Sequence, residues 1–285
     1  MSIPDESSAP EAPEGVDTEK PSAARVYDWF LGGIQNWAVD REFGKRVEAR
    51  WPHVRPGSRH NREFLGRAVR AALDAGIRQF IDLGSGVPTV GNVHEVVREH
   101  LPADEHATVV YVDYEPVAVA HATLLLERQG AGDWAGIVQA DIRDPKAVLR
   151  DETTRRLIDF DQPVCLLMLA VLHFVGPDDD ADGIMRTYRG RLVPGSWLVL
   201  SHMTVGGTTG EARRGVLDFA EQYRNTSNPV WLRDHHEVVE LFGDWELLEP
   251  GVVHIPDWRP ERQLAGPEVD ARPFAWCGVA VNRAR

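Results

Sequence analysis

The feature that most constrains the fold is the segment 80–86, Phe-Ile-Asp-Leu-Gly-Ser-Gly. An apolar run that ends at an acidic residue is typical of a buried parallel strand. Gly84 and Gly86 have no Cβ, so the backbone there can pass close to a ligand. The segment therefore predicts the first strand and first loop of a nucleotide-binding α/β sheet. A Gly-x-Gly pair alone is a weak signal, so the prediction depends on the segments that follow.

Apolar segments alternate with helical patterns along the rest of the chain. Further strands are expected at 108–113, 136–139, 164–170, 197–202, 245–249 and 276–282. Helices are expected at 91–100, from Pro116 onward, at 211–224 and at 234–242. Repeated β-α-β units with short connections predict an α/β fold, with a parallel sheet and helices on both of its faces.

Three parts are expected along the chain. Residues 1–20 are rich in Pro, Ser and acidic residues, which predicts a disordered tail. Residues 21–75 contain an aromatic segment broken at Gly32-Gly33 and a helix from Asn61 to Ala75. This part is expected to form a helical cap over the ligand edge of the sheet or along its side. Residues 76–285 are expected to form the ligand-binding domain.

Composition excludes several classes of function. The 285 residues carry a formal net charge of −13, which argues against a general affinity for nucleic acid or anionic membranes. Cys165 and Cys277 lie in apolar segments without ligand spacing, so we expect buried thiols and no metal site. Neither a signal segment nor an apolar run of about 18 residues is present, which predicts a cytoplasmic protein. The sequence makes no prediction of the oligomeric state.

Acidic residues stand at the ends of three consecutive predicted strands. Asp82 ends the first strand, Asp113 ends the second, and Asp141-Ile142 follows the third. Ligands of parallel α/β sheets bind outside the carboxyl ends of the strands. There Asp113 can accept hydrogen bonds from ribose hydroxyls and Asp141 from an adenine amino group, with Ile142 against the ring. A single such acid is more often a cap, as we expect for Asp144, but three together favour a ligand site.

The loop after the first strand indicates which nucleotide binds. A dinucleotide fingerprint needs a third small residue and free helix amides for the pyrophosphate, whereas this loop continues Val87-Pro88-Thr89. No Tyr is followed four residues later by Lys, which excludes one common dehydrogenase arrangement. Three carboxylates suit a cofactor that carries a cation, and S-adenosyl-L-methionine is such a cofactor. An NAD(P)-dependent oxidoreductase and a non-catalytic S-adenosylmethionine-binding protein are the alternatives.

These residues resemble the class I S-adenosylmethionine-dependent methyltransferases, and more closely a bacterial S-adenosyl methyltransferase family formerly catalogued as a domain of unknown function. The closer resemblance extends from about Arg25 to the C-terminus. It rests on Arg25-Val26-Tyr27-Asp28, Leu31-Gly32-Gly33, Asn36, Asp40-Arg41, Asn61-Arg62, Asp82 to Thr89, Asp113, Ala118 to Ala122, Gln139 to Arg143 and Leu172-His173-Phe174. Glu115 is a mild departure, because an aspartate is expected before the proline. The resemblance implies a Rossmann-like sheet of seven strands in the order 3-2-1-4-5-7-6, with the last strand antiparallel.

The resemblance also implies roles for residues around the cofactor. The Gly84–Gly86 loop would lie against the methionine part, above Asp82, and Asp113 would bind the ribose. Tyr27 and Asn36 are candidates for a lid, and the guanidinium of Arg62 suits the methionine carboxylate. The alternative is that Tyr27, Trp29 and Phe30 only pack the N-terminal helix. The full expected cofactor-binding set is Tyr27, Asn36, Arg62, Asp82, Gly84, Ser85, Gly86, Asp113, Tyr114, Asp141, Ile142, Ala170 and Val171.

Methyl transfer mainly requires that the acceptor be held in line with the methyl group, a positioning effect of roughly 7–11 kcal/mol. A general base helps when the acceptor is a hydroxyl. His173, after the fourth strand, is the first candidate for this catalytic base and His202 is the second; the alternative is that His173 is a hydrogen-bonded wall residue. The chain lacks the Asn-Pro-Pro-aromatic signature of amino-directed DNA methyltransferases. We therefore expect a small-molecule acceptor, with O- and N-methylation both open.

Overall fold

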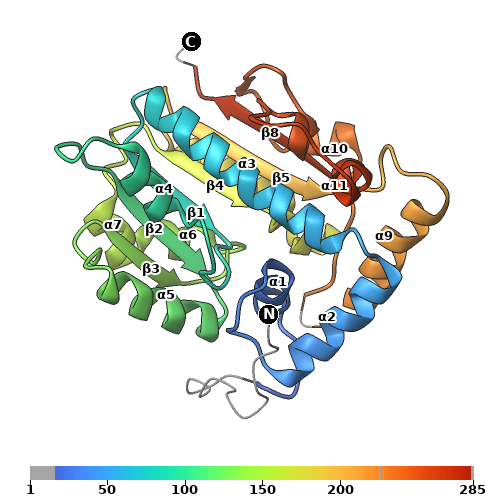
Figure 1. Ribbon diagram of the computed structural model, residues 1–285. Coiled ribbons are helices and arrows are strands. Elements are labelled where there is room, and N and C mark those ends of the chain that lie inside the picture. Colours follow the sequence, from blue (N-terminus) through green and yellow to red (C-terminus); the bar gives the residue numbers. More distant parts are fainter. Residues whose placement is uncertain (1–16, 225, 227, 284–285) are drawn as a thin grey trace.

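The fold was analysed in a computed structural model, which describes residues 17–224, 226 and 228–283. The predicted tail at 1–20 therefore falls mostly on residues outside this range. The described chain folds around one mixed sheet that is flanked by helices (Figure 1).

The strands form a single sheet in the order β3-β2-β1-β4-β5-β8-β6, with β7 paired to β8. Their bounds are β1 Gln79–Leu83, β2 Thr108–Asp113, β3 Ala135–Gln139, β4 Cys165–Leu169, β5 Trp197–Met203, β6 Glu246–Leu247, β7 Val253–His254 and β8 Ala275–Val281. Strands β1 to β5 pair in parallel, and β8 is antiparallel to both β5 and β6. The predicted topology is confirmed, and the two-residue β7 is an addition that the sequence did not predict.

The helices are arranged around this sheet. Their bounds are α1 Ala23–Leu31, α2 Ala38–Arg50, α3 Val54–Asp74, α4 Val93–His100, α5 Pro116–Arg128, α6 Pro145–Arg150, α7 Glu152–Leu157, α8 Ala181–Arg191, α9 Gly210–Tyr223, α10 His235–Glu240 and α11 Pro267–Ala271. Single 3₁₀ turns include η2 Leu172–Phe174, η4 Ile255–Asp257 and η5 Arg272–Phe274. As expected, Asp144 caps α6, where its side chain accepts a hydrogen bond from the Ala147 amide.

Alternate residues of each strand point to opposite faces of the sheet, and side chains from helices bury both faces. Ile81, Leu166 and Leu198 belong to the core that includes side chains of α6, α7, α8 and α10. Phe80 and Cys165 belong to the opposite core, which includes side chains of α3 and α4. The prediction of helices on both faces is confirmed. Cys165 and Cys277 are both buried free thiols, as expected.

The N-terminal helices share a third core with α9. Val26 and Phe30 of α1 pack there with Val47 of α2 and with Val216 and Phe219 of α9. Figure 1 shows α1, α2 and α9 beside the carboxyl ends of the strands, while α3 crosses one face of the sheet. Segments almost 200 residues apart therefore together cover the edge at which a ligand is expected.

One helix begins earlier than the sequence predicted. The expected helix at Asn61–Ala75 extends as α3 from Val54 to Asp74. Pro56 falls in the first turn of this helix, where its missing N–H needs no partner. None of the helices in the described part of the chain has the length and apolar character needed to span a bilayer.

Candidate functional site

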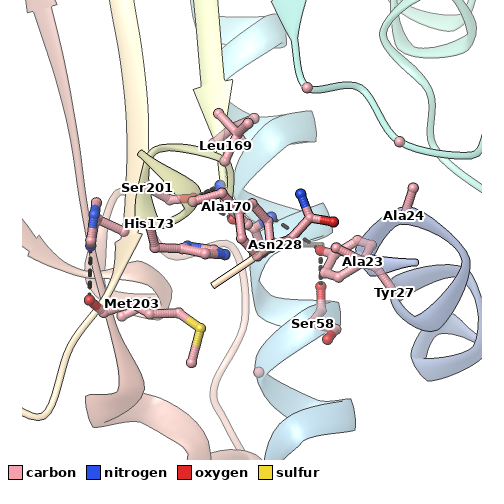
Figure 2. A pocket seen from close by; sticks show the side chains of 18 of the residues that line it. Ala23, Ala24, Tyr27, Ser58, Leu169, Ala170, His173, Ser201, Met203 and Asn228 are labelled. Atoms are coloured by element: carbon pink, nitrogen blue, oxygen red, sulfur yellow. Dashed lines mark hydrogen bonds between the residues drawn. The ribbon is translucent and has the colours of Figure 1, made fainter. Parts of the chain in front are cut away.

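A cavity opens at the carboxyl ends of the parallel strands, and the end of β4, the η2 turn, α1 and α3 all contribute to its wall (Figure 2). It brings together twelve of the thirteen residues predicted to bind a cofactor, and His173. Those lining the cavity are Tyr27, Arg62, Asp82, Gly84, Ser85, Gly86, Asp113, Tyr114, Asp141, Ile142, Ala170, Val171 and His173. Asn36 is the exception, because it does not line the cavity.

The loop after β1 requires glycine for two reasons. Gly84 and Gly86 have φ values of +70° and +68°, a conformation that L side chains rarely adopt. A Cβ on Gly84 would also lie 2.3 Å from Cγ2 of Val171, at the end of β4. The loop therefore packs directly against the β4 end while its backbone stays open to the cavity.

Asp82 is a buried carboxylate that faces the cavity. It lies on the same side of β1 as Phe80, toward α3, and none of the described residues forms a hydrogen bond with its carboxylate. Burial raises its pKa to about 7, against the opposing charge of Arg62 and with a further increase from Asp113. Such a group gains free energy from any cation that enters the cavity.

Asp113 organises the loops around it. Its Oδ2 accepts the Gly86 amide at 2.7 Å and its Oδ1 accepts the Glu115 amide at 2.9 Å. Burial raises its pKa to about 6, although the two amide hydrogen bonds favour the ionised form. Each oxygen keeps a lone pair beyond these bonds, because a carboxylate offers about four acceptor positions.

Asp141 is more exposed and is already paired. Arg143 holds it with a guanidinium nitrogen 2.6 Å from Oδ2, and its pKa is lowered because the Arg143 hydrogen bonds outweigh the effect of partial burial. Ile142 beside it is 8% exposed and lines the cavity. Tyr114, which follows β2, donates its hydroxyl to Oδ1 of Asn228 at 2.8 Å.

A hydrogen-bond network connects the N-terminal cap to the sheet. Asn61 donates from Nδ2 to the Tyr27 hydroxyl at 3.1 Å, and its Oδ1 accepts the Ser201 hydroxyl at 2.6 Å. Ser201 in turn accepts the Ala170 amide at 2.9 Å, where Ala170 has a φ of +53°. Tyr27 donates to the Ser58 carbonyl at 3.2 Å, a contact visible in Figure 2. The sequence analysis assigned no role to Ser201, or to the side chain of Asn61.

Asn36 holds the turn between α1 and α2 instead of facing the cavity. Its Nδ2 donates to Oδ2 of Asp28 at 2.8 Å, and Oδ1 of Asp28 accepts the Thr89 hydroxyl at 2.8 Å. A Cβ on Gly33 would lie 1.9 Å from Asp28, so the close turn requires glycine at that position. The Asp28–Gly33–Asn36 part of the N-terminal pattern thus fastens the cap to the loop after β1.

A second pairing fastens the same helix. Arg25 is 1% exposed and its Nε lies 2.8 Å from Oδ2 of Asp40 at the start of α2. Its Nη1 lies 3.3 Å from Oε1 of Glu115 in the loop after β2. A buried pair of this kind fixes geometry more reliably than it adds stability. It connects α1, several residues of which line the cavity, to α2 and to the loop after β2.

His173 lies at the cavity wall on the η2 turn, and its Nδ1 is buried without a hydrogen-bond partner among the described residues. Figure 2 shows its ring extending from η2 toward the middle of the site. Burial lowers the pKa of His173 well below its usual value, and the nearby His202 and Arg233 lower it further. The imidazole is therefore neutral and able to accept a hydrogen bond.

Arg233 clamps this turn. It donates to the Leu172 carbonyl at 2.9 Å and to the Val175 carbonyl at 3.0 Å, on either side of His173. It also lies 2.7 Å from Nε2 of His202, whose Nδ1 lies 2.8 Å from the Met203 carbonyl. Since an arginine can only donate, Nε2 of His202 accepts and its Nδ1 carries the proton. No local sequence pattern marks Arg233 as part of the site.

Comparison with known proteins gives three results. Residues 9–283 match the family described as S-adenosyl methyltransferase. A crystal structure of a Thermobifida fusca YX protein described as a methyltransferase is 36% identical, with a TM-score of 0.86, covering 95% of this chain and 98% of that one. A DUF574 family protein from Streptomyces avermitilis MA-4680 is 35% identical, with a TM-score of 0.83, covering 93% and 99% of the two chains.

More distant structures share the fold alone. An O-methyltransferase family protein from Burkholderia thailandensis is 16% identical with a TM-score of 0.52, covering 93% of this chain and 65% of that one. No curated protein matches the chain.

Proposed function

The chain belongs to the S-adenosyl methyltransferase family and is an S-adenosylmethionine-dependent enzyme, and from this premise we propose that it methylates a small molecule bound in the cavity beside His173. The observation that carries the proposal is the buried carboxylate of Asp82, which lines the cavity without a hydrogen-bond partner among the described residues. A cationic cofactor supplies the positive charge that would pair with this buried carboxylate.

The residues around the cavity fit the cofactor on independent grounds. Gly84 packs against Val171, and there is open space beside Gly86. Ser85 and Arg62 line the cavity, and Ser85 Oγ and Arg62 Nε are both buried without partners among the described residues. We assign Arg62 to the methionine carboxylate and Asp82 to the ammonium group. A hydroxyl donor, a guanidinium and a carboxylate match the groups of a zwitterionic amino acid.

Asp113 and Asp141 are assigned to the adenosine part. The remaining lone pairs of Asp113 suit the ribose hydroxyls, because both of its oxygens are already oriented by the Gly86 and Glu115 amides. Asp141 keeps acceptor positions beyond its bonds to Arg143, and Ile142 offers an apolar surface to the ring. Tyr114, Ala170 and Val171 complete the wall.

When bound, S-adenosylmethionine supplies a methyl carbon whose bond to sulfur breaks with the electron pair left on sulfur, while a lone pair of the acceptor forms the new bond and the acceptor loses a proton. The chain's part is to hold the acceptor in place and to receive that proton. Neutral His173 can accept it at a ring nitrogen, and Arg233 fixes the turn that carries the imidazole. The same neutral ring can accept a hydrogen bond from a hydroxyl or from an amine.

Equilibrium dialysis tests the cofactor assignment. Wild-type protein should bind S-adenosylhomocysteine and not NADH, because the loop with Pro88 lacks the free amides that a pyrophosphate needs. Asp113→Ala should weaken that binding by roughly tenfold or more, with His173→Ala having a much smaller effect. Asp218→Ala, an exposed change on α9, is the control. Tight NADH binding without S-adenosylhomocysteine binding would overturn the proposal, and equal losses in the Asp113 and His173 variants would overturn the assigned roles.

Transfer itself is measured with a labelled methyl group and extracts of small metabolites. We expect a labelled small-molecule product. If the acceptor is an amine, its yield should fall less in a His173 variant than in an Asp113 variant. If the acceptor is a hydroxyl, its yield should fall in both variants. Label found only in macromolecules would contradict the small-molecule assignment.

A further inference from the structure

Six aromatic residues line one part of the cavity, and we call them the aromatic chamber. They are Phe30, Trp51, Phe174, Phe219, Tyr223 and Phe274. They come from α1, the end of α2, η2, α9 and η5, and all but the half-buried Phe174 are less than 9% exposed. Aromatic rings around an open space select a ligand more narrowly than aliphatic side chains do, because aromatic rings favour particular packing geometries with other rings.

The rings form a continuous series that ends at His173. The ring centroids are 4.9 Å apart for Phe274 and Trp51, 5.2 Å for Trp51 and Phe219, and 4.6 Å for Phe219 and Tyr223. Tyr223 and Phe174 follow at 6.3 Å, and Phe174 and His173 at 4.3 Å. The series thus connects the N-terminal cap to the proposed proton acceptor.

The carboxylates of the cavity come from elements other than those that carry the chamber's rings. They are Asp82, Asp113, Glu115 and Asp141, all at the ends of β1, β2 and β3. Of the cavity's arginines, Arg62 is assigned to the cofactor, Arg143 is paired with Asp141, and Arg272 of η5 is paired with Asp257 at 2.5 Å. A charged acceptor in the chamber would therefore lose its water without gaining a counter-charge, which is costly.

His173 places a polar group at the end of the series, and Trp51 within the series has a buried Nε1 without a partner among the described residues. His173 is 4% exposed and its Nδ1 has no partner among the described residues, although the ring lies at the cavity wall. Its ring is neutral, so it accepts a hydrogen bond from a hydroxyl more readily than it pairs with an anion. A ligand that satisfies both the rings and this nitrogen is planar, uncharged and hydroxylated.

We infer that the methyl acceptor is an uncharged aromatic hydroxyl compound, with its ring in the aromatic chamber and its hydroxyl at His173. This inference rests on the proposed function and specifies its acceptor. Stacking and edge contacts with the rings select a flat molecule. Because Asp82 and Arg62 are assigned to the cofactor, no further counter-charge in the chamber would compensate a carboxylate or an ammonium group of the acceptor. Because the series of rings ends at His173, it sets the orientation of the acceptor's ring relative to that imidazole.

A matched set of probes tests the inference on the full chain saturated with S-adenosylhomocysteine. The probes are 2-naphthol, its saturated analogue 2-decalol, 2-naphthoate and 2-(aminomethyl)naphthalene, with Kd measured at pH 7 by titration calorimetry. Naphthol should bind several-fold more tightly than decalol, since ring pairs add a factor of roughly 2 to 10 beyond their buried area. It should bind at least roughly tenfold more tightly than either charged probe.

Variants of α9 locate the site. Phe219→Leu keeps an apolar side chain but removes a ring, so naphthol should lose most of its advantage over decalol. Leu217→Ala, on the same helix and 45% exposed, should change neither Kd. His173→Phe should weaken naphthol while leaving naphthalene, which has no hydroxyl, unaffected. S-adenosylhomocysteine binding, measured for every variant, verifies that each one is folded.

The outcomes separate the two claims. Failure to bind S-adenosylhomocysteine would overturn the proposed function and, with it, this inference. Normal S-adenosylhomocysteine binding with no naphthol binding, with decalol equal to naphthol, or with a charged probe binding most tightly would overturn the inference alone. Equal naphthol binding by Phe219→Leu and the wild type would place the ring elsewhere and also overturn it.

Discussion

The carboxyl group of Asp82 should make cofactor binding depend on pH. Burial raises its pKa to about 7, whereas only the ionised form can pair with the ammonium group of the cofactor. Binding therefore lowers the pKa and expels the proton. At pH 7 roughly half of the free protein carries this proton, so binding should release about half a proton per cofactor.

The sign and size of the affinity change follow from the same linkage. Below the pKa the free protein must first lose its proton, so affinity falls as the pH falls. Between pH 7 and pH 6 the loss from Asp82 is roughly fivefold, and below pH 6 it approaches tenfold per unit. Asp113, whose pKa is about 6, adds a further factor of roughly two between pH 7 and pH 6.

Titration calorimetry with S-adenosylhomocysteine measures both quantities. Repeating the titration in buffers of different ionisation enthalpy gives the number of protons released, and repeating it from pH 7.5 to pH 5.5 gives the slope of affinity. Asp82→Asn should bind more weakly at pH 7 and should retain only the twofold dependence that arises from Asp113. Identical proton release and identical slopes in wild type and Asp82→Asn would refute the assignment of the ammonium group to Asp82.

Three further outcomes are expected. Because burial raises the pKa of Asp82, the cofactor-free protein loses stability as the pH rises from about 4 to 7. At pH 8 the free energy of unfolding of Asp82→Asn, measured by chemical denaturation, should therefore exceed that of wild type by up to about 4 kcal/mol. An unchanged free energy of unfolding at pH 8 would contradict the burial argument. Arg233→Met removes a positive charge that adds to the effect of burial, so the pKa of His173 should rise in an NMR titration of its ring. An unchanged titration would show that Arg233 does not affect it. Gly33→Ala places a Cβ 1.9 Å from Asp28 and should lower the free energy of unfolding by about 2 kcal/mol or more, whereas Gly190→Ala, with open space around it, should change it by less than about 1 kcal/mol. Equal melting temperatures for the two variants would contradict the role of the turn at Gly33.

The sheet could be predicted because its signals are local. Each buried strand is a short apolar run, and the acids Asp82, Asp113 and Asp141 follow consecutive strands whose carboxyl ends meet at one edge. Once the order of strands was expected, the convergence of these residues on one cavity followed from parallel pairing.

Long-range contacts could not be predicted in this way. Asn61 reaches Ser201 across 140 positions, and the rings of Trp51 and Phe274 meet although no periodic pattern relates them. Such pairs depend on how α1, α2, α9 and η5 pack together, which no single segment specifies. The family resemblance did identify the N-terminal pattern, but it did not show that Asn36 holds a turn instead of facing the ligand.

The most direct test of the account is a crystal structure of the full chain with S-adenosylhomocysteine. The account predicts the ribose hydroxyls on Asp113, the ammonium group within hydrogen-bond distance of Asp82, and the sulfur facing the side of the cavity that contains His173 and the aromatic chamber. A cofactor bound with its ammonium group away from Asp82, or with its sulfur facing away from His173, would contradict it.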